Sequence, residues 1–233
     1  MEINRAEQIF YANPIRGDEF QFDTLESRHI AKVLRKKTGD LLYLTDGQGF
    51  FYQAEIIRAD KNKVIVKILE KIKEPEPKKK LHLFIAPLKS TNRMEWALEK
   101  STELGVWEIT PVITKHTERK KLNYERLDKI IIAAVKQSKR AYKPVLHRAI
   151  NLEDFIQSKE NAFVALCQAN KSSNHIFQSL EKARILIGPE GGFSLEEIRL
   201  LEKASVSAVR LGSYRLRSET AAIAATCLFH QIK

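Results

Sequence analysis

The pattern of apolar and polar residues divides the chain into an amino-terminal part rich in strands and a longer part in which strands alternate with helices. In the first part, Asp46-Gly47 and Asp60-Lys-Asn-Lys63 are typical of turns, and each is flanked by short apolar stretches. We therefore expect a small β-rich domain built around a three-stranded meander, with strands over residues 40–45, 50–57 and 64–69.

A short amphipathic helix is expected before the meander, over residues 27–36. Its apolar face would carry Ile30, Val33 and Leu34, and its opposite face four cations, Arg28, Lys32, Arg35 and Lys36. A basic helix on a small barrel suits contact with an RNA backbone, since cations neutralise phosphates and release counterions. An ordinary solvated helix face explains the same pattern equally well.

Residues 70–80 (EKIKEPEPKKK) have the composition of a linker, because two prolines disfavour a helix and the charges cannot pack into a core. We place the first domain at residues 1–72, the linker at 73–80 and the second domain at 81–233.

The second domain has the alternation of strands and helices that predicts an α/β fold, a parallel sheet with helices on both faces. Strands are expected over residues 81–86, 107–113, 162–167, 184–187 and 208–211. Helices are expected over residues 92–104, 124–139 and 218–232, and after a capping box at Ser194-Leu-Glu-Glu197.

Composition narrows the class of protein. The chain has 233 residues, is 43% hydrophobic and 30% charged, and can therefore bury a core. Its formal net charge of +11 favours a polyanionic partner, most simply a nucleic acid. We expect no membrane segment, because no apolar run approaches the roughly 20 residues that one requires.

The two cysteines, Cys167 and Cys227, lack CxxC spacing, which suits a reducing cytoplasm. The six histidines are scattered along the chain without HExxH or paired spacing, so we expect no metal site. No Gly-x-Ser-x-Gly sequence is present, which argues against hydrolase chemistry of that kind.

Two glycine-containing loops carry the most chemical information. Each follows a short apolar strand and precedes a helix: Gly188-Pro-Glu-Gly-Gly192 in one case and Leu211-Gly-Ser-Tyr-Arg-Leu-Arg217 in the other. Such loops can line one crevice at the carboxyl edge of a parallel sheet. Neither has the glycine spacing of a dinucleotide fold or of a Walker A loop, so we expect a different small molecule.

Arg217 and Glu219 stand at the expected start of the last helix. A cation at a helix amino terminus is locally unfavourable, so Arg217 favours an anionic partner, whereas Glu219 there is also explained by simple capping. Glu190 in the first loop is explained equally well by a role in catalysis and by a role in fixing the loop.

These loops and several other segments give the chain a resemblance to the bacterial small-subunit ribosomal RNA uridine-N3 methyltransferases (RsmE type), members of the SPOUT class. The resemblance extends over essentially the whole chain. The resemblance rests on His29-Ile-Ala-Lys-Val-Leu-Arg35, Lys89-Ser-Thr-Asn-Arg-Met-Glu95, Lys100-Ser-Thr-Glu-Leu-Gly105, Leu186-Ile-Gly-Pro-Glu-Gly-Gly192, Leu211-Gly212 and Leu216-Arg-Ser-Glu-Thr-Ala221. Ser213, Tyr214 and Arg215 depart from the family pattern, which leaves the roles of Tyr214 and Arg215 open.

The resemblance implies a PUA-like RNA-binding barrel followed by a parallel sheet whose carboxyl-terminal chain forms a trefoil knot. It also implies a homodimer that acts on 16S rRNA or the small ribosomal subunit, with S-adenosylmethionine as cofactor. The residues that the resemblance places against this cofactor are Leu166, Cys167, Gln168, Ile187, Gly188, Pro189, Glu190, Gly191, Leu211, Gly212, Leu216 and Thr220.

The implied reaction is attack of a uracil N3 on the methyl carbon, for which the N3 proton must leave or the N3 anion must be stabilised. Arg217 would stabilise negative charge on the uracil oxygens, and Glu219 or Glu190 would accept the proton. Phosphate contacts are expected from cations in both domains, namely Arg28, Arg35, Lys89, Arg93, Lys115, Arg119, Lys120, Lys139 and Arg140.

Two alternatives remain at this point. A pseudouridine synthase would also join an RNA-binding module to a basic catalytic domain, and Arg126-Leu-Asp128 is similar to the Arg-Leu-Asp of that class, although the preceding glycine is absent. A non-catalytic ribosome-assembly factor that kept the fold would bind RNA but not S-adenosylmethionine.

Overall fold

A computed structural model describes residues 8–157, 161–169, 177 and 179–231. The chain forms two compact units, one of residues up to Glu76 together with Val135–Lys143, the other of Pro77–Ala134 and Pro144–Lys233. The predicted linker, residues 73–80, spans this division. Strands reach into both of its ends, because β5 extends to Lys73 and β6 begins at Lys80. Nothing in the sequence pattern indicated that residues 135–143 belong to the first unit.

The first unit is built on a five-stranded mixed sheet with the strand order β1-β3-β4-β5-β2. Its elements are β1 (Ile9–Tyr11), β2 (Glu19–Gln21), α1 (Thr24–Arg28), η2 (His29–Val33), β3 (Leu41–Thr45), β4 (Phe50–Asp60) and β5 (Lys63–Lys73). The predicted meander is β3-β4-β5, all antiparallel, and β1 adds to β3 in parallel. One buried core joins the sheet to the helical segment, with Phe10, Ile30 and Leu44 at its centre.

The helix predicted over residues 27–36 differs from the observed helical segment. An α-helix begins at Thr24, three residues earlier, because the Asp23 carboxylate accepts a hydrogen bond from the backbone N–H of Glu26 at 2.7 Å. From His29 the segment is a π-helix, which rotates the following side chains away from the α-helical register. Ile30 is buried as expected, but Val33 is 67% exposed, so its placement on the apolar face was wrong.

The second unit is built on a seven-stranded sheet whose strand pairings, in the described residues, are parallel. The strand order is β12-β10-β11-β6-β7-β8, and β9 pairs with β7. Its strands are β6 (Lys80–Ile85), β7 (Glu108–Ile113), β8 (Val145–Leu146), β9 (Ile150–Asn151), β10 (Ala162–Ala165), β11 (Lys182–Ile187) and β12 (Ser207–Val209). Its helices are α2 (Thr91–Glu103), α4 (Leu152–Gln157), α6 (Leu195–Lys203), α7 (Ser218–Gln231) and most of α3 (Tyr124–Gln137), whose last residues, from Val135 on, belong to the first unit.

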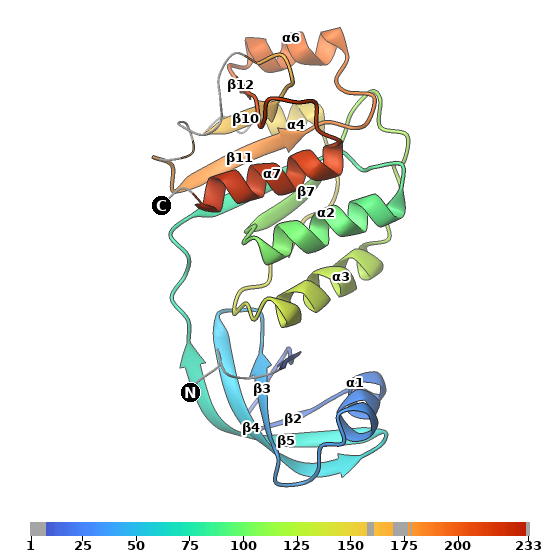
Figure 1. The fold of residues 1–233 in the computed structure, drawn as a ribbon, viewed down its shortest axis with the longest axis vertical. Helices are drawn as coiled ribbons and strands as arrows, with labels where there is room; N and C mark the ends of the chain where they lie inside the picture. Colours follow the sequence, from blue (N-terminus) through green and yellow to red (C-terminus); the bar gives the residue numbers. More distant parts are fainter. Residues whose placement is uncertain (1–7, 158–160, 170–176, 178, 232–233) are drawn as a thin grey trace. The chain divides into compact units, whose positions relative to one another are not determined.

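Helices cover both faces of this sheet, which confirms the predicted α/β class (Figure 1). On one face, Leu152 and Phe155 of α4 and Leu201 of α6 pack on Phe84 and Leu186 of the strands. On the other face lie α2 and α7, which contact each other. The strands are apolar on both sides because both sides are buried, as expected for a parallel sheet.

The main strands and helices of this unit lie where the sequence predicted them, within a few residues, and the capping box at Ser194 and Glu197 is present. The short elements β8, β9 and α4 were missed, because runs of two to six residues carry no measurable periodicity. The predicted end of the last helix at residue 232 lies outside the described residues. The threading of the carboxyl-terminal chain through an earlier loop is not tested by strand pairing and stays a prediction.

Candidate functional site

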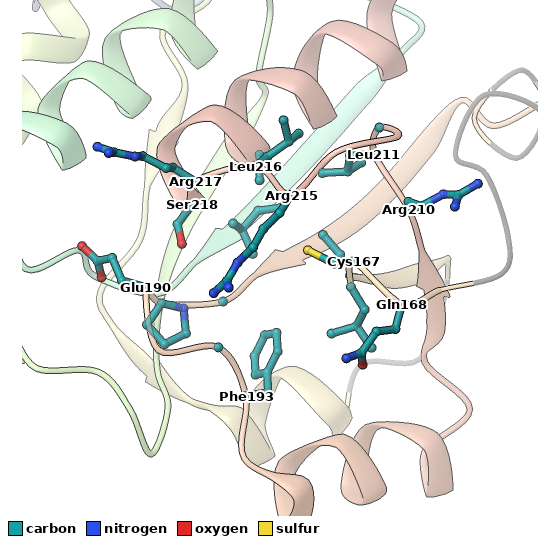
Figure 2. Close-up of a pocket in the computed structure, with 18 of the residues that line it drawn as sticks. Cys167, Gln168, Glu190, Phe193, Arg210, Leu211, Arg215, Leu216, Arg217 and Ser218 are labelled. Carbon is teal, nitrogen blue, oxygen red and sulfur yellow. The ribbon is translucent and has the colours of Figure 1, made fainter.

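A cavity of about 830 Å³ lies at the carboxyl ends of β10, β11 and β12. These three strands are neighbours and parallel, so their following loops meet at one edge of the sheet. The walls come from both glycine-containing loops, from α6 and α7, and from one residue of α2 (Figure 2). Its lining residues are Arg93, Ala165, Leu166, Cys167, Gln168, Ile187, Gly188, Pro189, Glu190, Gly192, Phe193, Leu195, Ile198, Arg210, Leu211, Gly212, Tyr214, Arg215, Leu216, Arg217, Ser218 and Ala221.

The loop after β11 is a tight turn closed by a hydrogen bond from the N–H of Gly192 to the carbonyl of Pro189 at 2.9 Å. Gly192 has a φ of 70°, which side chains rarely permit. A Cβ on Gly188 would lie 2.8 Å from the ring of Phe193, so only glycine lets that ring pack against the turn. The loop therefore needs glycine at these two positions for separate reasons.

Two neighbouring segments hold this loop in place. The backbone N–H of Lys89, after β6, donates to Oε1 of Glu190 at 3.1 Å. On the other side, Nδ1 of His116 lies 3.0 Å from the carbonyl oxygen of Gly192, and the N–H of Lys115 donates to buried Glu197 at 2.7 Å. The glycine loop is thus tied to the segments that follow β6 and β7, and its backbone is preorganised.

The loop after β12 ends at Arg217, whose carbonyl accepts the first hydrogen bond of α7 from Ala221 at 2.7 Å. The N–H groups of the first turn of α7 are therefore at this edge of the cavity, where they favour an oxygen of a ligand. Figure 2 shows Arg215 pointing into the cavity, toward the Gly188–Glu190 loop, whereas Arg210 and Arg217 point away from its centre. Arg217 and Glu190 lie on the same side of the cavity.

Glu219 lies in the first turn of α7 but does not line the cavity. Its side chain is 8% exposed, and its Oε1 lies 3.5 Å from Nε of Arg93, which does line the cavity. Within the described part of the chain, the buried Oε2 of Glu219 has no hydrogen-bond partner. Glu219 is therefore buried beside an arginine that lines the cavity and does not itself line it.

The structure brings nearly all predicted cofactor-binding residues together. Each of them lines the cavity except Gly191 and Thr220. Of the three predicted catalytic residues, Arg217 and Glu190 line it and Glu219 does not. Sequence reasoning missed the apolar wall formed by Phe193, Leu195 and Ile198, because their spacing on the start of a helix looks like ordinary core packing. The sequence also indicated no role for Arg215, which the structure directs into the cavity.

The predicted phosphate contacts fall on both units and differ in exposure. Arg28, Arg35, Lys89, Lys115, Arg119 and Lys120 are exposed, and Arg93, Lys139 and Arg140 are partly buried. Lys89 pairs with Glu118 at 2.9 Å and Lys115 with Glu196 at 2.8 Å, and such exposed pairs exchange readily for phosphate. Burial lowers the pKa of Arg140 to about 10, which leaves the guanidinium charged near neutral pH but less accessible to a phosphate than the exposed cations.

Arg126, which carried the likeness to pseudouridine synthases, is engaged within the second unit. It binds both carboxylate oxygens of Glu95, with Nε 2.5 Å from Oε1 and a terminal nitrogen 3.0 Å from Oε2. This bidentate pair links α3 to α2 and gives Arg126 a structural role.

Comparison with known proteins gives consistent matches over both units. A family model described as an RNA methyltransferase domain matches residues 74–230, and one described as an RNA methyltransferase PUA domain matches residues 23–69. A protein from Rickettsia conorii named ribosomal RNA small subunit methyltransferase E is 32% identical over 97% of this chain and 94% of its own. A protein of the same name from Mesomycoplasma hyopneumoniae is 33% identical over 92% of this chain and 95% of its own.

Among solved structures, that of a ribosomal RNA small subunit methyltransferase E from Neisseria gonorrhoeae bound to S-adenosylmethionine superposes with a TM-score of 0.85. It is 26% identical and covers 94% of each chain. In the described residues of the present chain, no helix has both the length and the apolar character to cross a membrane.

Proposed function

The chain belongs to the RNA methyltransferase family, and we propose from this premise that it transfers a methyl group from S-adenosylmethionine to N3 of a uridine in 16S ribosomal RNA. The observation that carries the proposal is the cavity at the ends of β10, β11 and β12, lined by both glycine-containing loops. The relative from Neisseria gonorrhoeae, solved with S-adenosylmethionine, supports the choice of cofactor.

The lining residues fit this cofactor. Leu166, Ile187 and Leu216 offer an apolar slot for a flat base, and Gly188 and Gly212 leave backbone groups open to hydrogen bonds. Arg215 points into the cavity and would meet the carboxylate of the amino-acid portion. The cofactor supplies an activated methyl group, so the protein has to bind, orient and exclude water.

We assign the substrate side of the cavity to the rim where Arg217 and Glu190 both lie. There Arg217 would stabilise negative charge on a uracil oxygen, and Glu190 would accept the N3 proton. Glu190 is exposed and lines the cavity, so it is the better placed of the two carboxylates. Glu219 would position Arg93, and Arg93 would bind a phosphate next to the target nucleotide.

N3 lies on the pairing edge of uracil, so the target must be unpaired or flipped out of its stack. The first unit, matched by an RNA methyltransferase PUA domain, would bind the surrounding RNA through Arg28 and Arg35. We also propose that the protein acts in the cytoplasm, where a ribosomal RNA substrate would be met.

We further propose that the protein acts as a homodimer with each cavity close to the subunit interface. Two large apolar side chains of the cavity wall support this, since Tyr214 is 87% and Leu195 75% exposed. Sedimentation of the purified chain tests the proposal. A monomer at micromolar concentration would contradict it.

The decisive experiment is transfer of labelled methyl from S-adenosylmethionine to small ribosomal subunits that lack the modification, followed by mass spectrometry of nucleosides. Recovery of 3-methyluridine at one site is the expected result. Label in another nucleoside would overturn the uridine assignment but keep the cofactor. Absence of label, with protein and subunits intact, would favour a non-catalytic assembly factor.

A further inference from the structure

His82, Glu108 and His147 converge on one face of the sheet of the second unit, at a place outside the cavity. One ligand atom from each of the three lies within 4.8 Å of the others. They are far apart in sequence, but the strand register brings them together. His82 of β6 is opposite Glu108 of β7, and His147 directly follows β8, which pairs with β7.

The distances from Glu108 to the two imidazoles bracket the spacing that a metal ion requires, and the two imidazole nitrogens lie within 4.8 Å of each other. Oε2 of Glu108 lies 2.6 Å from Nε2 of His147 and 3.7 Å from Nδ1 of His82. Four-coordinate Zn²⁺, with bonds of about 2.0–2.1 Å, places its ligand atoms about 3.3 Å apart, between these two distances. Small side-chain rotations therefore suffice to admit an ion.

The second ring nitrogen of His82 is hydrogen-bonded, as that of a metal-binding histidine usually is. Its Nε2 lies 2.7 Å from Oγ1 of Thr110, which leaves Nδ1 directed at Glu108. Glu108 and His147 are 32% and 39% exposed, so an ion can enter from solvent.

From this convergence we propose that His82, Glu108 and His147 form a binding site for a divalent transition-metal ion, Zn²⁺ in particular. Two imidazoles and one carboxylate suit Zn²⁺ and disfavour Mg²⁺ and Ca²⁺, which prefer oxygen ligands. A water molecule completes the four ligands. The ion ties β6 and β7 to the segment after β8 and so stabilises the second unit, without touching the cavity.

The neighbouring Arg184 sets the affinity. Its guanidinium lies over the rings of Phe84 and Phe155, at 4.9 and 5.9 Å, and its charge acts on both His82 and Glu108. A fixed positive charge repels a divalent ion, so Arg184→Gln is expected to tighten binding at least about tenfold. A purely structural hydrogen-bond cluster would give no such gain.

The test uses the full chain, freed of metal by a chelator and titrated with Co²⁺ and Zn²⁺. We expect one equivalent of Co²⁺ to produce the visible absorption of a four-coordinate site, Zn²⁺ to displace it, and Zn²⁺ to raise the melting temperature. His147→Ala and Glu108→Gln should each abolish the signal, and the matched control His29→Ala should retain it.

Two results would overturn the proposal: no saturable Co²⁺ or Zn²⁺ binding by the folded wild-type chain, or binding that survives both His147→Ala and Glu108→Gln. Methyl transfer is a separate readout. Because none of the three residues lines the cavity, the chelated protein should still transfer methyl groups, so failure of the metal site leaves the proposed function untouched.

Discussion

Glu219 of α7 lies with its Oε1 3.5 Å from Nε of Arg93 on α2, and this pair connects the helix at the cavity to a neighbouring helix. The carboxylate is almost completely buried, while the guanidinium is 43% exposed and lines the cavity. A buried carboxylate that pairs with a half-exposed cation sets the position of that cation. We propose from this relationship that Glu219 positions Arg93.

Glu219→Gln is therefore expected to lower kcat on the order of 10²-fold, as misplacement of a substrate-positioning group does. Arg93→Gln should have a similar effect, and the double variant should be no slower than either single variant, because the two residues act as a unit. Steady-state kinetics with small ribosomal subunits as substrate measures kcat for the wild type, the two single variants and the double variant. Effects that multiply in the double variant would show that Glu219 acts independently of Arg93.

Substitutions at Glu190 distinguish a role in proton transfer from a role in holding the loop. Glu190→Gln keeps an oxygen that accepts the N–H of Lys89 but cannot take up a proton, so kcat should fall by about 10² to 10⁴ with cofactor affinity retained. Glu190→Ala should lose both kcat and affinity, because the loop loses its anchor. If Glu190→Gln behaves like wild type, the carboxylate only fixes the loop.

Arg217 has a control in the same cavity. Arg217→Ala should reduce kcat by about 10² to 10³, the usual loss when one group that stabilises a developing negative charge is removed. Arg210→Ala removes a lining arginine on the opposite side of the cavity from Arg217 and Glu190, and it should lower kcat less. Equal losses in both variants would indicate a general electrostatic effect on RNA binding, which a steeper salt dependence of KM would reveal.

Gly188→Ala tests the packing of the glycine loop. The new methyl group would lie 2.8 Å from the Phe193 ring, and such overpacking typically costs about 1–3 kcal/mol in the free energy of unfolding. Gly212→Ala is the matched control, since only Leu216 Cδ1 comes near the added Cβ, at 4.0 Å. Urea unfolding of both variants measures the difference, and equal stabilities would show that Phe193 moves aside without penalty.

Much of this architecture could be predicted from the sequence because its signals are local. Buried strands such as residues 81–86, the amphipathic helices and the Ser194–Glu197 capping box each depend on residues within a few positions of one another. Both loops of the cavity were found in the same way. Their meeting at one edge follows from the rule for parallel sheets.

The features that could not be predicted from the sequence depend on contacts between residues far apart in the chain. The convergence of His82, Glu108 and His147 needs the register of β6, β7 and β8, which the spacing of these residues along the chain does not reveal. The inward direction of Arg215 and the pairing of Glu219 with Arg93 likewise need coordinates. The π-helix after Arg28 shifted Val33 to the surface, which an α-helical period could not foresee.

Tyr52 makes the stability of the first unit sensitive to alkaline pH. Its buried hydroxyl donates to Oδ2 of Asp46 at 3.0 Å, and burial, this hydrogen bond and the charge of Asp46 all raise the pKa of Tyr52. The unfolded chain releases this proton near the usual pKa of about 10, whereas the folded chain retains it to higher pH. The contribution of Tyr52 to the free energy of unfolding is therefore fully present below about pH 10 and is lost as the pH rises further. Tyr52→Phe should be less stable than wild type by about 1 kcal/mol near pH 8, since a buried hydrogen bond is gone, yet its stability should fall less steeply above about pH 10. Urea unfolding at a series of pH values compares the two slopes, and identical slopes would mean that Tyr52 ionises as freely in the folded chain as in the unfolded one.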